Sequence, residues 1–245
     1  MGARLRAVAL AVVAPFILVG CVLVPGKFAS TLHIAADRSF AFTYQGEVIA
    51  IDLAGEMAKI GAMGRAAGDA DTDTETGPSG ISLDDIAFQD AEGADEQAKA
   101  DARFRAIADA LRKEPGYRSV EYKGDGLFAI DYATRGSLTH GFVYPYNIDA
   151  EMVFPFVVIE LRGRDQVRVK APAFGETDTP GGMGGSSPSN DRMDGTFTLT
   201  TDAEVVSQNN EDGVASEGGR KKIVWKATPL SQDAPMAVLR VQPLR

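Results

Sequence analysis

This 245-residue sequence contains few of the residue patterns that mark a catalytic or metal-binding site. Its one thiol is Cys21, and its two imidazoles, His33 and His140, lack the local spacing of a zinc site, where three or four ligands are usual. The acidic stretch 69–73 lacks the glycine and the glutamate that an EF-hand loop needs at its sixth and twelfth positions. No G-x-S-x-G motif occurs, and the glycine-rich stretch 181–187 lacks the lysine of a phosphate-binding P-loop. We therefore predict no metal, no cofactor and no catalytic residue, so that the protein is not an enzyme.

The thiol stands in a distinctive context at the N-terminus. Residues 18–21 read LVGC, and they end an apolar run over residues 7–20 that follows a basic start with two arginines, which is the layout of an export signal. This tetrapeptide resembles the lipobox of bacterial lipoprotein precursors. The resemblance implies that a signal peptidase cuts between Gly20 and Cys21, that the thiol carries a diacylglycerol, and that the freed amino group is acylated.

Acyl chains on Cys21 imply a lipid-anchored protein of the cell envelope, because two chains together give a stable membrane anchor. Val22 follows the cysteine, where aspartate signals inner-membrane retention in lipoproteins, so the resemblance favours the outer membrane with the domain facing the periplasm. The alternative is an uncleaved membrane anchor, because the apolar run continues to Val24 and approaches the ~20 residues of a spanning helix. Both alternatives tether the rest of the chain on the same side of the membrane.

Charge and length limit the partners and the architecture. Residues 1–20 hold two arginines and no acid, so the mature chain has a net charge of 23 − 34 = −11. This charge argues against nucleic acid, whose affinity rests on lysine and arginine, and against a polybasic contact with anionic lipid headgroups. The remaining 245 − 20 = 225 residues suit one domain, which we place at 28–245 after an acylated N-terminus and short tether at 21–27.

Alternation of polar and apolar residues predicts a mainly antiparallel sheet built from hairpins. The fold class is then α+β, with eight or nine strands and two helices inserted after the first hairpin. The strands are predicted at 28–36, 39–51, 117–123, 127–138, 152–162, 166–171, 196–207, 221–228 and 236–242, and the helices at about 53–60 and 94–113. Segments 64–80 and 175–195 are small, polar and glycine-containing, and we predict flexible inserts there.

Residues 142–156 concentrate aromatic side chains around Pro145 and Pro155, which predicts an edge strand or a bulge. Aromatic side chains beside an open edge are candidates for lining a lipid-like ligand groove or for resting at the membrane interface. The alternative is core packing around a bulge. On the ligand hypothesis, polar substitution of Phe154 and Phe156 reduces binding without unfolding the domain. The candidate residues are Phe142, Tyr144, Tyr146, Phe154 and Phe156.

The C-terminal half contains Asp194-Gly195-Thr196-Phe197, a predicted strand through residues 204–206 and, after a polar loop, Ile223-Val224-Trp225-Lys226. This order of segments is similar to the end of LppM-type lipoprotein domains. The similarity implies an envelope lipoprotein with a lipid-binding-like α+β domain and no known catalysis. The C-terminal membrane helix of that family has no counterpart, because residues 236–245 are too short and too polar.

Three functions follow from these features. The leading hypothesis is a non-enzymatic, membrane-anchored lipoprotein that binds an apolar, lipid-like ligand at the 142–156 edge. The second is a structural or assembly accessory lipoprotein whose sheet edge pairs with a strand of an envelope protein partner. The third is a hydrolase of envelope polymers, which needs two close carboxylates of perturbed pKa.

Overall fold

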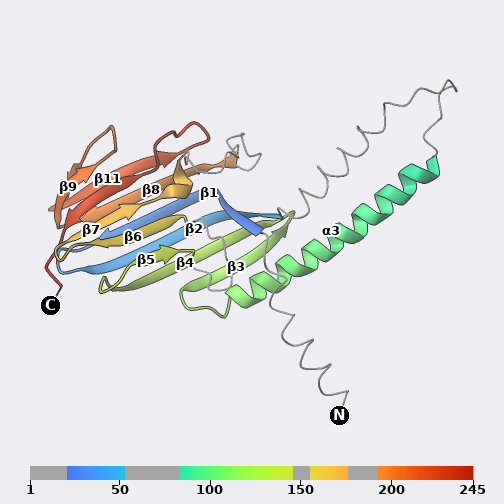
Figure 1. Ribbon diagram of the computed structural model, residues 1–245, viewed down its shortest axis with the longest axis horizontal. Coiled ribbons are helices and arrows are strands. Elements are labelled where there is room, and N and C mark those ends of the chain that lie inside the picture. Colours follow the sequence, from blue (N-terminus) through green and yellow to red (C-terminus); the bar gives the residue numbers. More distant parts are fainter. Residues whose placement is uncertain (1–20, 53–82, 146–154, 176–191, 245) are drawn as a thin grey trace, which may run out of the picture.

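The computed structural model describes residues 21–52, 83–145, 155–175 and 192–244, with the side chains of the helix described from residue 97. Within these ranges the strands form two sheets that pack face to face as a β-sandwich, and one long helix lies at the side of the sandwich (Figure 1).

The larger sheet has seven strands in the order β10-β11-β8-β1-β2-β4-β3. Its first hairpin is the predicted one: β1 and β2 pair antiparallel across the turn at 37–38. β1 also pairs with β8 in parallel, which a succession of simple hairpins does not produce. The strands are β1 (Cys21–Ile34), β2 (Ser39–Asp52), β3 (Tyr117–Gly124), β4 (Leu127–Ser137), β8 (Asp194–Thr201), β10 (Ala215–Glu217) and β11 (Arg220–Ala227).

The smaller sheet has five strands in the order β5-β6-β7-β12-β9. Its centre is the predicted hairpin of β6 and β7, joined by the turn at 163–165. A single 3₁₀ turn, η2 (Pro172–Phe174), follows β7. The strands are β5 (Phe142–Tyr144), β6 (Val157–Arg162), β7 (Gln166–Lys170), β9 (Glu204–Gln208) and β12 (Met236–Arg240).

The predicted α+β class is wrong, because the described chain is mostly β, with one helix and two sheets of seven and five strands rather than eight or nine strands in hairpins. Residues 196–207, predicted as one strand, form β8 in one sheet and β9 in the other. The chain turns between them at Asp202, where Thr201 Oγ1 accepts a hydrogen bond of 2.9 Å from the N–H of Ala203. Thr201 and Ala203 are both buried and Asp202 is exposed. The alternation therefore continues through the corner, and periodicity cannot reveal it.

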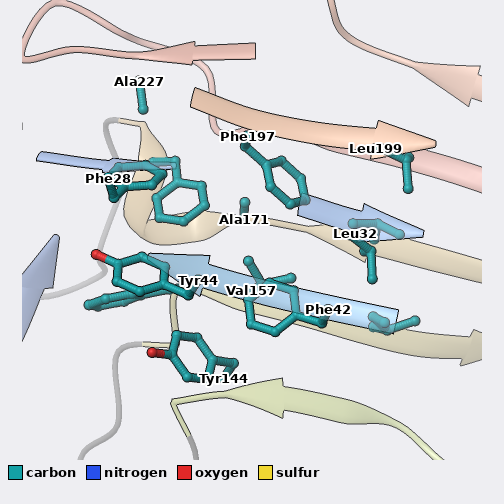
Figure 2. Packing of buried hydrophobic residues seen from close by; sticks show 14 of the residues in the cluster. Phe28, Leu32, Phe42, Tyr44, Tyr144, Val157, Ala171, Phe197, Leu199 and Ala227 are labelled. Carbon is teal, nitrogen blue, oxygen red and sulfur yellow. The ribbon is translucent and has the colours of Figure 1, made fainter. Parts of the chain in front are cut away.

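The core lies between the inner faces of the two sheets and is rich in aromatic rings (Figure 2). The ring of Phe28, from β1, stacks 4.3 Å from the ring of Phe174 in η2. Two glycines leave space for Phe28, Gly195 for its ring and Gly46 for its main chain. A Cβ on Gly195 would lie 2.2 Å from the Phe28 ring, and Gly46, at φ +154°, would carry a Cβ 2.5 Å from Phe28 Cα. Close packing of this kind leaves no room for a larger residue at either glycine.

The described helix, α3 (Leu83–Leu111), docks on the β3–β4 hairpin through one stripe. Phe104 is 4% exposed, and its ring lies 5.7 Å from that of Tyr122 and 5.9 Å from that of Phe128. The hydroxyl of Tyr122 donates a 2.5 Å hydrogen bond to Asp101 Oδ1. The helix predicted at 94–113 corresponds to the C-terminal part of α3, which begins at Leu83, and Phe104 and Ala108 are its buried residues in the described range.

The helix predicted at 53–60 and the inserts predicted at 64–80 and 175–195 lie largely or wholly outside the described residues. No helix in the described ranges is both long enough and apolar enough to cross a membrane.

Candidate functional site

The aromatic segment at 142–156 contributes to the core of the sandwich. β5 lies at the edge of the smaller sheet, as its prolines predicted. Tyr144 is 2% exposed and Phe156 0%, whereas Phe142 is half-buried against the ring of Phe40, 5.3 Å away. Tyr146 and Phe154 lie outside the described residues. Tyr144 and Phe156 therefore fill the interior and do not line an open groove.

Tyrosine rings connect this edge to the middle of the core. The ring of Tyr132 lies 4.9 Å from that of Tyr117 and 4.6 Å from that of Tyr144, which in turn lies 5.4 Å from that of Tyr44. Burial raises the pKa of each of these four groups, and raises that of Tyr117 to about 12. At neutral pH the hydroxyls stay protonated; that of Tyr44 donates a 2.8 Å hydrogen bond to the main-chain oxygen of Glu47.

An unpaired sheet edge lies beside these tyrosines, because β4 is longer than its outer neighbour. β3 pairs with β4 only as far as Tyr132, whereas β4 continues to Ser137. The N–H of Ala133 points to the β3 side, where it donates to the oxygen of Gly116 at 2.8 Å. Since main-chain groups alternate sides along a strand, the N–H and C=O of Arg135 point the same way. Within the described ranges they have no hydrogen-bond partner.

A groove of about 560 Å³ runs beside this edge. Small and polar side chains line it, with an arginine from β4 and another from the start of β3. The lining residues are Ala41, Phe42, Thr43, Pro115, Gly116, Arg118, Ala133, Thr134 and Arg135. We call this groove, together with residues 135–137 of β4 beyond the last contact with the β3 side, the β4 edge site.

The two arginines make the β4 edge site a cationic site. Arg118 Nη1 lies 3.8 Å from Asp131 Oδ1, which is too far for a hydrogen bond, and that oxygen is buried without a hydrogen-bond partner. Arg135 is exposed and forms no ion pair with the described part of the chain. A strand with free main-chain donors and acceptors and flanking arginines can bind an extended peptide that carries carboxylates.

The unequal strand lengths could have revealed this site from the sequence. Predicted strands 117–123 and 127–138 are joined by a short turn, so the longer one must extend past its partner. The difference leaves the far end of the second strand without a β3 partner, which is what the structure shows at residues 135–137.

The predicted acylation site, Cys21, is the first residue that the structure describes. β1 starts at Cys21, opposite Asp52 in β2, rather than at Phe28 after a separate tether. Gly20 lies outside the described residues. If acylated, Cys21 therefore connects the anchor directly to a strand of the sandwich.

Ionisable groups elsewhere do not assemble a centre for acid–base or metal chemistry in the described ranges. No three histidine, cysteine, aspartate or glutamate side chains there lie close enough together to hold a metal ion. The carboxyl groups whose pKa is shifted are those of Asp37, Glu160 and Glu217, and hydrogen bonds lower each of them. A general acid needs a shift in the opposite direction.

Comparison with known proteins defines no family for this chain. No protein-family model and no curated protein sequence matches it. Among solved structures it is similar to the NMR structure of the folded domain of LppM from Mycobacterium tuberculosis, at 15% identity, over 91% of this chain and 92% of that chain, with a TM-score of 0.29. A TM-score this low supports no argument about function. The similarity to LppM-type domains therefore stays an expectation.

Proposed function

We propose that this protein is a lipid-anchored protein of the bacterial cell envelope that binds a protein partner by strand addition at the β4 edge site. Cys21 carries the anchor, and the sandwich faces the periplasm from the outer membrane. The protein is not an enzyme. It holds a partner at the membrane surface.

The observation that carries this proposal is the main chain of Arg135, near the end of β4, which has no partner on the β3 side within the described ranges. An exposed strand edge is a template for pairing, and natural proteins usually block such edges with bulges, prolines or short strands. Residues 133–137 have none of these features and remain in register with β2. A partner strand here would extend the seven-stranded sheet by main-chain hydrogen bonds, and Arg118 and Arg135 would select acidic side chains.

Burial of the predicted aromatic residues favours this function over an apolar ligand. Tyr144 and Phe156 are packed between the sheets, and binding a lipid among them would require the core to open. The hypothesis of a partner at a sheet edge, in contrast, needs no rearrangement of the described residues.

Site-specific photocrosslinking tests the proposal in the full-length protein in its own membrane. We expect Arg135→benzoylphenylalanine to form a crosslinked product with a protein. Lys226→benzoylphenylalanine, which places the same group on the far side of the same sheet, is the control and should not. Equal crosslinking from both positions would contradict a specific edge site.

A pair of proline substitutions separates strand addition from other contacts. Arg135→Pro removes a donor that points away from β2, so the domain should fold and the crosslink from a neighbouring position, Ser137, should disappear. Thr134→Pro removes a donor that points toward β2 and should unfold the sheet. Retention of the crosslink in a folded Arg135→Pro variant would exclude main-chain pairing, whereas Arg135→Ala tests the contribution of the charge alone.

A further inference from the structure

The outer face of the smaller sheet is cationic although the chain is acidic. Strand register places ten side chains on this face in three rows across β5, β6, β7 and β12. Four of the ten are cations, one is an acid, one is a neutral amide and four are apolar. Glu204 of β9, the register partner of Arg240, adds a second acid, so the face carries a net charge of 4 − 2 = +2. The rows are Val143, Val158, Lys170 and Met236; Glu160, Arg168 and Val238; and Arg162, Gln166 and Arg240.

The carboxylate of Glu160 lies within 4 Å of three of these cations. Glu160 Oε2 accepts hydrogen bonds from Arg168 Nε at 2.9 Å and Nη2 at 2.5 Å, and Glu160 Oε1 accepts one from Lys170 Nζ at 2.7 Å. Arg162 Nε lies 3.8 Å from Glu160 Oε2. The group therefore holds two positive charges in excess, fixed in place by the carboxylate between them. Arg240 is paired with its cross-strand neighbour on the same face, Glu204 of β9, at 3.0 Å.

Apolar side chains lie among these cations. Three valines and Met236 are half-buried on the same face, and Val206, in the irregular part of β9 beside β12, is 42% exposed. Cations mixed with apolar side chains are the composition of surfaces that rest in the headgroup region of a bilayer.

The net charge of the chain does not oppose such a contact, because most of the negative charge comes from one stretch of the sequence. Residues 52–96 contain 12 of the 34 acids and only two of the 25 cations, a net charge of 2 − 12 = −10. The rest of the chain from Cys21 onward has 21 cations and 22 acids, a net charge of −1. Interactions beyond about 8 Å are largely screened at physiological ionic strength, so the local charge decides what this face attracts.

A core contact connects the smaller sheet to the strand that leads to the anchor. Lys170 ends β7, and η2 follows it directly. Phe174 of η2 stacks on Phe28 of β1, and Cys21 is the first residue of that strand. An anchor at Cys21 is thus joined to the packed sandwich by a strand, so the smaller sheet is held at the membrane together with the larger one.

From these observations we infer that the outer face of the smaller sheet docks on an anionic phospholipid bilayer. The contact orients the anchored domain on its membrane. It uses a surface different from the β4 edge site and does not depend on a protein partner. Both can bind at once, because they lie on different sheets.

The lone cysteine makes a direct test practical with the full-length, acylated protein. A second cysteine, Val158→Cys on this face or Val224→Cys on the outer face of the larger sheet, is then the only free thiol and takes an environment-sensitive dye. The two positions are matched half-buried valines. We expect the dye at residue 158 to shift to the blue in phosphatidylcholine vesicles containing phosphatidylglycerol, relative to phosphatidylcholine alone. The dye at residue 224 should not shift, and high salt should reverse the shift at 158.

Charge variants in the Val158→Cys protein complete the test. Arg162→Gln and Lys170→Gln should each lower the docked-to-undocked ratio by up to about fivefold, because a cation near an anionic surface contributes about that factor. Lys222→Gln, on the other sheet, should leave it unchanged. Near-ultraviolet circular dichroism confirms that the variants are folded. Equal emission at residue 158 in the two vesicle types, or an equal shift at residue 224, would overturn the inference. Labelling at two thiols would instead show that Cys21 is not acylated, which concerns the proposed anchor and not this face.

Discussion

The Nε of Arg38 donates a 2.5 Å hydrogen bond to the main-chain oxygen of Gln242, 204 residues further along the chain. The same guanidinium donates to the oxygen of Leu138 at 3.1 Å and to that of Arg164 at 2.6 Å. Arg38 is 4% exposed, at φ 74° in the turn between β1 and β2. One side chain in a predicted tight turn therefore fastens the β4–β5 connection, the β6–β7 turn and the C-terminal segment to one end of the sandwich.

Arg38→Met should destabilise the domain by about 3 kcal/mol, because it leaves the main-chain oxygens of Leu138 and Gln242 without their donor at a largely buried position. The oxygen of Arg164 keeps the hydrogen bond from the N–H of Leu244 at 2.8 Å. Urea unfolding followed by circular dichroism measures the loss. Arg220→Met, at an exposed position of β11, is the matched control and should change the free energy of unfolding by less than about 0.5 kcal/mol. Equal effects of the two substitutions would show that the buried guanidinium does not fasten the sandwich.

Phe156→Ala should cost about 3–5 kcal/mol of stability, because its ring is fully buried between the sheets. Phe142→Ala, at the half-buried position of the same edge, should cost clearly less. Thermal unfolding compares the two. This expectation replaces the earlier one that a polar residue at Phe156 impairs binding without unfolding. If the Phe156→Ala protein were as stable as the Phe142→Ala protein, the Phe156 ring would not stabilise the core, and the segment would again be a candidate surface site.

Stability should fall steeply above pH 10. All five described tyrosines have a raised pKa, chiefly because they are buried, and that of Tyr117 is about 12. The unfolded chain loses these protons near pH 10 and the folded chain does not, so the stability is complete below pH 10 and is lost as pH rises through the folded pKa values.

Urea unfolding between pH 8 and pH 11.5 measures how the free energy of unfolding falls at alkaline pH. Tyr117→Phe should make its slope less steep, because one titrating group is removed. A free energy of unfolding that stays constant to pH 11.5 would contradict the burial of these hydroxyls.

Intact mass spectrometry of the membrane-extracted protein tests the anchor. We expect a chain that begins at Cys21 and carries added acyl mass, and we expect Cys21→Ser to retain residues 1–20 and to lack that mass. A wild-type mass equal to the unprocessed chain would instead identify residues 7–24 as an uncleaved membrane anchor.

Local patterns predicted much of the local structure. The alternation over residues 39–51 predicted a strand there, and β2 covers Ser39–Asp52, with Phe42 and Tyr44 fully buried on its inner face. The hairpins around the turns at 37–38 and 163–165 were also predicted, because turn residues and alternation act over a few neighbours. The helix predicted at 94–113 corresponds to the C-terminal part of α3.

Long-range packing decided the rest, because no local pattern records which sheet a strand joins. The corner at Asp202 preserves the alternation of buried and exposed residues while it moves the chain from one sheet to the other. The parallel pairing of β1 with β8 joins residues far apart in sequence, and so does the hydrogen bond from Arg38 to the main-chain oxygen of Gln242. Local sequence patterns indicated a lipobox-like tetrapeptide at 18–21 and the hairpin turns. Three other features depend on the register between strands and became visible only in the fold. They are the burial of Tyr144 and Phe156, the extension of β4 past β3, and the gathering of the cations of β6, β7 and β12 on one face.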